Sequence, residues 1–307
     1  MNKVKGYLYG CISSATYGLV PLFTLPLMSR GMHYDSILFY RYFFATLFLA
    51  AILKLSGKSF KIERADILPL MGLGSLFALS SLFLFMSYLY MESGIASTIL
   101  FFYPILVTLI MAIFFREKIT WATVASIMLA FVGIGLLYKG DKGMPLSMFG
   151  IFIVFLSALA YALYIVGVNK TRVNTMEGDK LTFYALLVGS GIFFVKLKFG
   201  TNLQMISGLE SWFDVIMLAL VPTVVSCVAM VWAVHNVGST VTAILGALEP
   251  VTAVFVGIVV FKEPLTVNMA VGILMIILAV TVIILGKSIQ NMSFASLKAM
   301  ASRIIKK

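Results

Sequence analysis

The chain is poor in the residues that build a catalytic or metal centre. Its 307 residues include two cysteines, two histidines and 12 acidic residues. Cys11 and Cys227 each lie within an apolar run, which argues against a disulfide framework or a thiolate metal site and favours buried thiols. His33 and His235 are far apart and show no metal-ligand spacing. No phosphate-binding loop or nucleotide fingerprint occurs. We therefore expect no metal, no cofactor, no ATP hydrolysis within the chain and no enzymatic activity.

Charged residues are also scarce, and apolar residues replace them. The chain is 61% apolar and 11% charged, whereas soluble domains average about 25% charged residues. No globular core of this size absorbs such an apolar excess, so the hydrophobic surroundings must be lipid. The net charge of +11 comes from short basic clusters between apolar runs rather than from a basic stripe. That pattern is typical of membrane orientation, and we expect no nucleic-acid partner.

Long apolar segments follow one another along almost the whole chain. A membrane helix needs about 20 mostly apolar residues. On that rule the sequence predicts ten spans, at 6–28, 34–55, 67–90, 95–115, 120–138, 148–168, 181–197, 212–235, 239–261 and 266–286. The seventh span is the weakest, because Lys196 and Lys198 shorten its apolar stretch. The loops leave no room for an extramembrane domain.

The basic residues predict the orientation of the chain. With the N-terminus in the cytoplasm, about sixteen Lys and Arg residues fall on the inner side and about six on the outer side. We therefore expect a multi-pass protein of the cell (inner) membrane with both termini cytoplasmic. The basic tail at 287–307 is too polar to span, and it is either an amphipathic helix on the inner leaflet or a disordered solubilising segment.

A proline followed thirteen residues later by a glutamate occurs twice, as Pro104–Glu117 and Pro250–Glu263. These pairs align at a shift of 146 residues, and nearer the N-terminus Tyr17 aligns with Tyr161 at a shift of 144. The chain is thus two copies of one unit, at 5–138 and 146–286. Five spans in each copy make the second copy enter the membrane from the other side, which predicts two inverted repeats.

These segments resemble a known family. The runs at 94–120 and 238–266, the stretch Tyr40–Ala45 and the stretch Leu248–Val251 are similar to the two EamA repeats of the drug/metabolite transporter superfamily. The resemblance implies an all-α membrane protein of ten helices in two inverted five-helix repeats. It also implies a central cavity, a small-molecule substrate and export of metabolites such as amino acids.

The two copies differ at the position before the repeated proline, where Tyr103 in the first corresponds to Glu249 in the second. Ionisable groups inside membrane spans are costly and usually functional. Glu249 is a candidate for binding a substrate amine or for taking up a proton. The alternative is a protonated carboxyl that bonds a neighbouring helix beside Pro250.

Arg41 is the second candidate charge within a span. It lies roughly 9 Å along its helix from Asp35, at 1.5 Å per residue. Its planar guanidinium suits a substrate carboxylate. The alternative is an arginine near the outer leaflet that extends toward the interface or bonds helix-end carbonyls.

The remaining candidates are prolines, tyrosines, serines and glutamates that are less specific for a binding site. Pro104 and Pro250 each remove a backbone hydrogen bond and are expected to kink their helices, by the cavity or as packing features. Tyrosine rings and serine hydroxyls within the spans suit a cavity for a small amphipathic solute. The alternative is that they pack helices together. These residues are Tyr17, Tyr161, Tyr164, Ser80 and Ser226. Glu117 and Glu263 are expected to form local ion pairs or to cap the next helix.

Together these patterns predict a secondary transporter that exports small metabolites by alternating access. Its expected partners are the substrate, the lipid bilayer and, as a further candidate, protons. Two fused halves remove the need for a dimer, so a monomer or weak dimer is expected. The alternative function is a lipid-translocating or structural accessory subunit of the membrane.

Overall fold

The structure is a computed structural model that describes residues 3–116, 121–139, 147–237, 242, 245–282 and 285. Within these ranges the chain is helical and contains no strand. The first half has α1 (Lys3–Tyr17), α2 (Val20–Ser29), α3 (Tyr34–Leu55), α4 (Arg64–Ser87), α5 (Ser93–Leu100), α6 (Tyr103–Phe115) and α7 (Trp121–Lys139). The second half has α8 (Met148–Lys170), η1 (Arg172–Thr175), α9 (Gly178–Lys196), α10 (Leu209–Ala219), η2 (Leu220–Val225), α11 (Ser226–Val237), α13 (Leu248–Val259) and a helix at Val267–Val282. Glu117 and the tail at 287–307 lie outside the described residues.

The described apolar helices are not equally long. Seven described helices are long and apolar enough to cross a membrane, and three are shorter, at Thr123–Leu136, Leu248–Val259 and Val267–Val282. The seventh predicted span is α9, which has the lowest mean hydropathy of the seven long helices, at 1.3, and ends at Lys196. The three shorter helices fall within the ranges predicted for the fifth, ninth and tenth spans.

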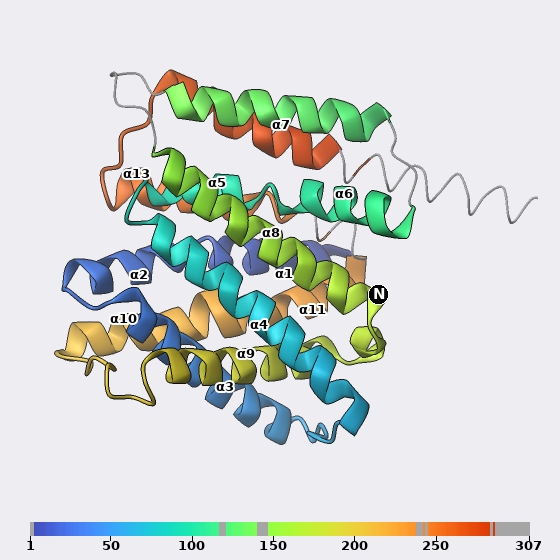
Figure 1. The fold of residues 1–307 in the computed structure, drawn as a ribbon, viewed down its shortest axis with the longest axis vertical. Helices are drawn as coiled ribbons and strands as arrows, with labels where there is room; N and C mark the ends of the chain where they lie inside the picture. Colours follow the sequence, from blue (N-terminus) through green and yellow to red (C-terminus); the bar gives the residue numbers. More distant parts are fainter. Residues whose placement is uncertain are drawn as a thin grey trace, which may run out of the picture.

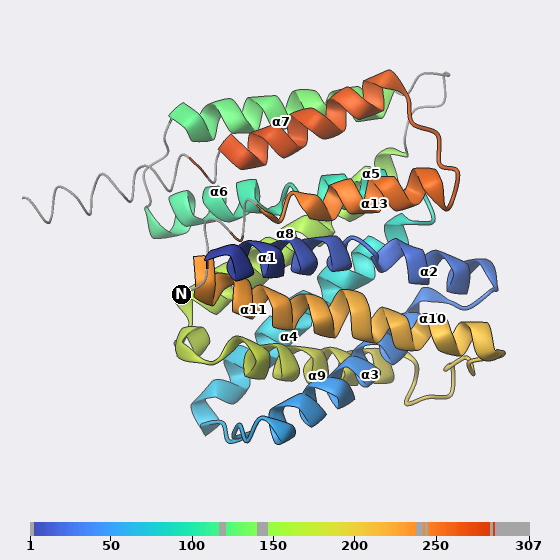
Figure 2. The same cartoon turned by 180° about the vertical axis from the view of Figure 1, so that it is seen from behind.

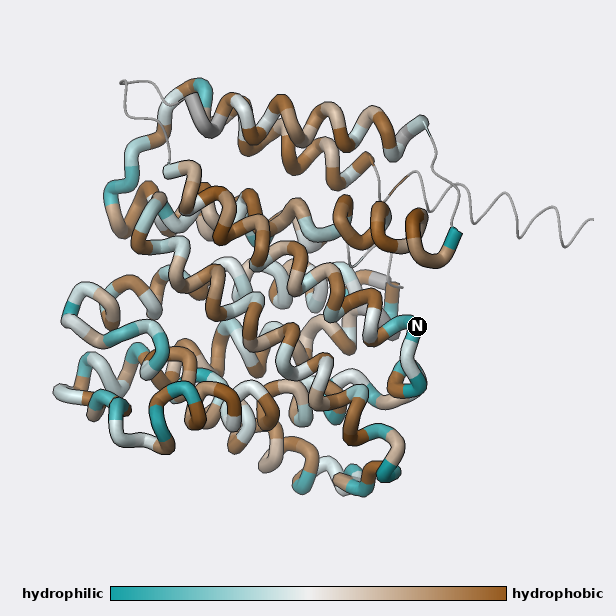
Figure 3. Tube along the Cα trace, in the orientation of Figure 1, coloured by the Kyte–Doolittle hydropathy of each residue, from teal (hydrophilic) through white to brown (hydrophobic). Residues whose placement is uncertain are grey.

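The helices run roughly side by side between two faces of the molecule (Figures 1 and 2). The N-terminal face carries the loops at 56–63 and 171–177, and the opposite face carries the loops at 30–33 and 197–208. α7 and the Val267–Val282 helix form the outermost layer at one end of the long axis, and α3 lies at the other end. Figure 3 shows apolar residues along the helices and polar residues concentrated in the loops. Exposed apolar side chains such as Phe43, Phe131 and Phe255 fit a lipid-facing surface.

α3 and α9, which are equivalent in the two repeats, pack against each other in opposite directions. Asp35 at the start of α3 pairs with Lys196 at the end of α9. Asp179 at the start of α9 pairs at 2.6 Å with Lys58, just after the end of α3. Lys58 also contacts Glu177 at 2.8 Å, and its hydrogen bonds to these carboxylates raise the pKa of its ammonium group. Aspartates at equivalent positions therefore tie α3 to α9 at both faces.

Two further helix pairs join the repeats through serines. Ser13 Oγ on α1 donates to the Ser226 carbonyl on α11, and Ser226 Oγ donates back to the Ser13 carbonyl, both at 2.9 Å. On the pair α4 and α8, Ser157 Oγ donates to the Ser80 carbonyl at 2.7 Å, and the two hydroxyls lie 3.2 Å apart. These are the two most extensive helix–helix contacts of the described chain. Since Ser157 follows Ser13 by 144 residues and Ser226 follows Ser80 by 146, both pairs are copies of one serine clasp.

Removing one hydroxyl from each clasp is expected to have matched effects. Ser13→Ala and Ser157→Ala should each lower the free energy of unfolding by about 0.6 kcal/mol, the average for interhelical hydrogen bonds in membrane proteins. Denaturant unfolding of the purified protein in detergent measures both. Ser75→Ala is the control, because Ser75 is only partly buried and bonds the Met71 carbonyl of its own helix. A loss in one clasp and none in the other would contradict their equivalence.

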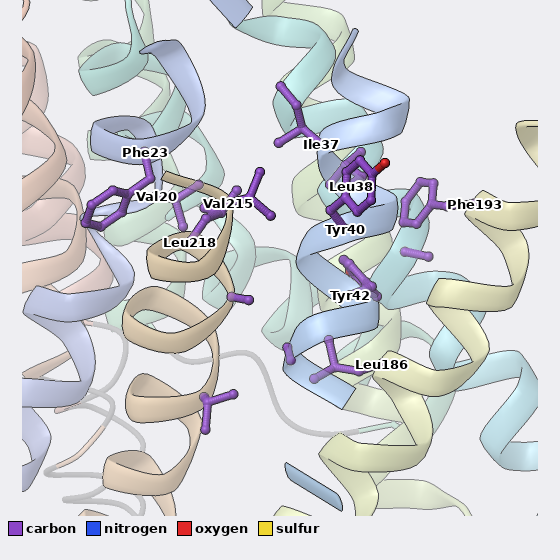
Figure 4. Close-up of a cluster of buried hydrophobic side chains, with 14 of the residues drawn as sticks. Val20, Phe23, Ile37, Leu38, Tyr40, Tyr42, Leu186, Phe193, Val215 and Leu218 are labelled. Atoms are coloured by element: carbon purple, nitrogen blue, oxygen red, sulfur yellow. The ribbon is translucent and has the colours of Figure 1, made fainter. Parts of the chain in front are cut away.

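A buried apolar cluster holds α2, α3, α9 and α10 together (Figure 4). Phe23 and Val20 of α2 face Val215 and Leu218 of α10, while Phe193 of α9 lies beside α3. A second buried cluster joins α5, α6 and α8 to the Val267–Val282 helix.

Candidate functional site

Several helices are interrupted inside the molecule at or next to a proline. α1 ends at Tyr17 and α2 begins at Val20, with Pro21 in its first turn. α5 and α6 are separated by Phe101 and Phe102, and Pro104 is the second residue of α6. Pro250 is the third residue of α13, after a turn at 246–247. The predicted kinks at Pro104 and Pro250 are therefore helix starts, where the missing backbone N–H is not needed.

The first and ninth spans meet at their interruptions. A Cβ atom on Gly18 would lie 2.5 Å from the Glu249 carbonyl oxygen and 2.7 Å from Thr252 Cβ. Only glycine permits this approach of α1 to the first turn of α13. The contact places Glu249 beside Tyr17, the residue that precedes Gly18. Glu249 as a whole residue is partly buried.

Four of the predicted tyrosines lie around these breaks. The rings of Tyr103 and Tyr161 meet edge to face with centroids 4.7 Å apart, and Tyr161 stacks on Tyr164 at 6.0 Å. Tyr164 continues to Phe77 of α4 at 5.2 Å. The equivalent pair in the other half is Glu249 with Tyr17, so the Tyr103–Glu249 difference between the repeats exchanges a ring for a carboxyl group. Tyr17, Tyr103, Tyr161 and Tyr164 are each only partly buried, as a cavity lining requires.

Arg41 is inside the molecule, with 1% of its surface exposed. The alternative of an arginine that extends outward to the interface is therefore wrong. Its Nε donates to Thr223 Oγ1 at 2.9 Å. Its guanidinium carbon lies 6.0 Å from the ring centre of Tyr17 and 5.7 Å from that of Phe85. Arg41 thus belongs to the same interior region as Tyr17 and Glu249.

The two interior charged residues, Arg41 and Glu249, do not pair with each other. No ion pair joins Arg41 to Glu249 or to any other carboxylate among the described residues. The Tyr17 ring lies 6.0 Å from the Arg41 guanidinium carbon, and the next residue, Gly18, contacts the Glu249 backbone. Tyr17 therefore lies near both charged residues.

Two predicted residues do not join this region through their hydroxyl groups. Ser80 and Ser226 are buried and use their hydroxyls in the serine clasps, so we assign them to helix packing. Thr223, which orients Arg41, was missed. It lies in the π-helical turn η2 after Pro222, 182 residues from Arg41, and no sequence signal links the two. Ser13 and Ser157 were missed as well, although their spacing of 144 residues equals that of Tyr17 and Tyr161.

Glu263 caps a helix of the other repeat. The predicted local ion pair or cap on the next helix is therefore wrong. Its carboxylate accepts hydrogen bonds from the Ser93 backbone N–H at 2.9 Å, the Ser93 hydroxyl at 2.7 Å and the Gly94 N–H at 3.4 Å. These residues begin α5, where a negative group satisfies free N–H groups and the helix dipole. Lys262 before it has φ 56°, and its equivalent Arg116 has φ 55°. The repeat is thus preserved in the backbone as well as in the sequence.

The Glu263 cap requires glycine at position 257. A Cβ there would lie 2.0 Å from Glu263 Oε2. Gly257→Ala and Glu263→Ala should each lower the free energy of unfolding by about 1 kcal/mol, the usual effect of losing a cap. In the Glu263→Ala background Gly257→Ala should cost little, because the clashing carboxylate is gone. Thermal unfolding of the three variants tests this, with Gly191→Ala as control because nothing lies within 4 Å of its Cβ position. Additive losses would contradict the contact.

Comparison with known proteins agrees with this architecture. Residues 4–139 and 148–285 each match the EamA-like transporter family. The chain belongs to this family. Within the EamA-like family, an "Uncharacterized transporter" of Archaeoglobus fulgidus is 25% identical over 243 residues, which cover 77% of this chain and 83% of the relative. The "Uncharacterized transporter YxxF" of Bacillus subtilis is 26% identical over 233 residues, 74% of this chain and 69% of the relative.

A solved structure described as "Crystal structure of protein" has the same fold. Its TM-score is 0.65 at 18% identity, over 90% of this chain and 95% of that chain. With the family match, it supports a multi-pass integral membrane protein of a transporter family, built from an EamA duplication. The predicted family and duplication are confirmed.

Proposed function

We propose that this EamA-family protein is a secondary transporter of the inner or plasma membrane that exports small metabolites, such as amino acids, by alternating access. The observation that carries the proposal is the meeting of two interrupted helices from opposite repeats, α1–α2 at Gly18 and α13 at Glu249. Discontinuous helices that meet at a repeat interface commonly form the substrate sites of transporters. Glu249, Tyr103, Tyr17, Tyr161, Tyr164 and Arg41 are the proposed substrate-binding or proton-coupling residues.

The proposal includes ten spans as two inverted repeats, with both termini in the cytoplasm and a monomer or weak dimer as the working unit. The N-terminal face then faces the cytoplasm. Ion pairs link helices at both faces, Arg30 with Asp214 at 2.6 Å on the opposite face and Lys58 with Asp179 on the N-terminal face. Two similar packings of inverted halves would expose such a region to each side in turn.

Metabolite profiles of the medium test this function. Cells that overexpress the protein are compared with cells that lack it, and each solute that differs is then tested in vesicles containing the purified protein. We expect at least one small soluble metabolite to accumulate in the medium and to exchange across the vesicle membrane. Vesicles that move a labelled phospholipid but none of the soluble metabolites would favour lipid translocation instead.

A further inference from the structure

Arg41 differs from the described arginines and lysines that form ion pairs. Arg30 is paired with Glu210 and Asp214, Arg172 with Glu63 and Asp66, Lys58 with Asp179, and Lys196 with Asp35. All of these lie at the two faces. Arg41 is more deeply buried than any of them, yet its described neighbours are a hydroxyl group and aromatic rings rather than a carboxylate.

The guanidinium group of Arg41 is held in a defined orientation. Its Nε is bonded to Thr223 Oγ1, and Thr223 in turn donates its hydroxyl proton to the Leu218 carbonyl at 3.0 Å. This second bond lies within the π-helical turn region, a feature that is frequent at functional sites. Tyr17 and Phe85 lie near the guanidinium as aromatic neighbours. Thr223 therefore positions Arg41 by accepting the hydrogen bond from its Nε.

The two terminal nitrogens remain. Among the described residues the Tyr17 side chain also hydrogen-bonds Arg41, and no carboxylate pairs with the guanidinium. Burying a cation without an anion is unfavourable, and inside a membrane protein it usually marks a ligand pathway. Two terminal nitrogens of one guanidinium match the two oxygens of a carboxylate in a planar fork.

We infer that Arg41, positioned by Thr223, binds the carboxylate of the transported solute. The inference rests on the proposed function and narrows its substrate class to solutes with a carboxylate. A single guanidinium balances one negative charge on the solute. The carboxyl group of Glu249 in the same region disfavours a second negative charge. A monocarboxylate, with the rest of the molecule among the tyrosine rings, fits this arrangement better than a phosphate or a dicarboxylate.

Ligand-induced stabilisation of the purified full-length protein tests this inference without a transport assay. The probes are acetate, benzoate and L-leucine, each beside its amide. A ligand that binds only the folded protein raises its Tm. We expect at least one carboxylate to raise Tm and its amide to have little effect. Arg41→Lys should weaken the apparent Kd at least about tenfold, because a point charge replaces a two-pronged donor.

Positioning by Thr223 gives a separate readout. Thr223→Val should weaken carboxylate binding, and Thr223→Ser, which keeps the hydroxyl group, should restore it. Thr46→Val is the matched control on α3, since the Thr46 hydroxyl bonds only the Tyr42 carbonyl of its own helix. Equal stabilisation by carboxylates and amides, the absence of any carboxylate effect, or an unchanged effect in Arg41→Met would overturn the inference.

The stability of Arg41→Met without ligand separates binding from a structural role. Methionine removes the unpaired buried charge, and the Thr223 hydroxyl keeps its bond to Leu218. We expect Tm to stay the same or rise, as it often does when a buried charge is replaced by an apolar side chain. A clear fall in Tm would assign Arg41 to structural support. Carboxylate binding through Arg41 in a protein that moves no solute would leave this inference standing while the proposed function fails.

Discussion

Replacement of Glu249 by glutamine is expected to reduce transport at least about tenfold and to remove its dependence on pH. Glutamine keeps the shape of the side chain and loses the charge and the exchangeable proton. A hydrogen bond to a charged group contributes about 1.5–3 kcal/mol, and about 1.4 kcal/mol corresponds to tenfold in affinity. Solute exchange in vesicles, measured at several pH values with the solute found by metabolite profiling, gives the result.

The control for this substitution is Glu210→Gln. Glu210 is an exposed acid on the opposite face, paired with Arg30 at 3.0 Å, and its loss should leave both rate and pH profile unchanged. If Glu249→Gln also transports at the parental rate with the parental pH profile, Glu249 neither binds a substrate amine nor carries a proton.

Gly18→Ala is expected to damage both stability and transport. The new methyl group would lie 2.5 Å from the Glu249 carbonyl oxygen, which is backbone and has no rotamer through which to move away. Overpacking a tight contact usually costs about 1–3 kcal/mol. The contact is released by displacing α1 from α13, which also moves Glu249 away from Tyr17. We expect a lower Tm in detergent. We also expect a transport rate below that of the parental protein, as for Glu249→Gln.

Gly72→Ala is the matched control for Gly18→Ala. Gly72 lies inside α4, whereas Gly18 lies in the turn between α1 and α2, and nothing lies within 4 Å of the Gly72 Cβ position. Alanine there favours the helix and should leave transport unchanged. Parental stability and parental transport in Gly18→Ala would show that α1 and α13 do not depend on this close approach.

The repeat was readable from the sequence, since the Pro–Glu spacing is a local pattern that duplication preserves. Its structural consequences were only partly readable. Proline chemistry predicts a disturbed helix, but whether it bends or restarts depends on neighbouring segments such as α1 at Gly18. The seventh span was predicted at 181–197, and α9 runs from Gly178 to Lys196, so its start was predicted three residues too late.

The interior charges show the limit of sequence reasoning more clearly. Glu249 was found because its equivalent is Tyr103, a comparison that needs only the sequence. Arg41 was found as a charge within a span, but its burial depends on Thr223, 182 residues away, and on the irregular turn that presents it. Long-range partners of this kind leave no periodic pattern. The serine clasps are an intermediate case, because Ser13 and Ser157 repeat at a spacing already present in the sequence.

Access to the interior region from both sides of the membrane is the most direct test of the account. Tyr164→Cys is placed in a background with Cys11→Ser and Cys227→Ser, in vesicles of known orientation, and a membrane-impermeant thiol reagent is added to one side at a time. Alternating access predicts that position 164 reacts from either side while the reagent itself does not cross. Reaction from one side only, or passage of the reagent through the protein, would contradict a transporter with this interior binding region.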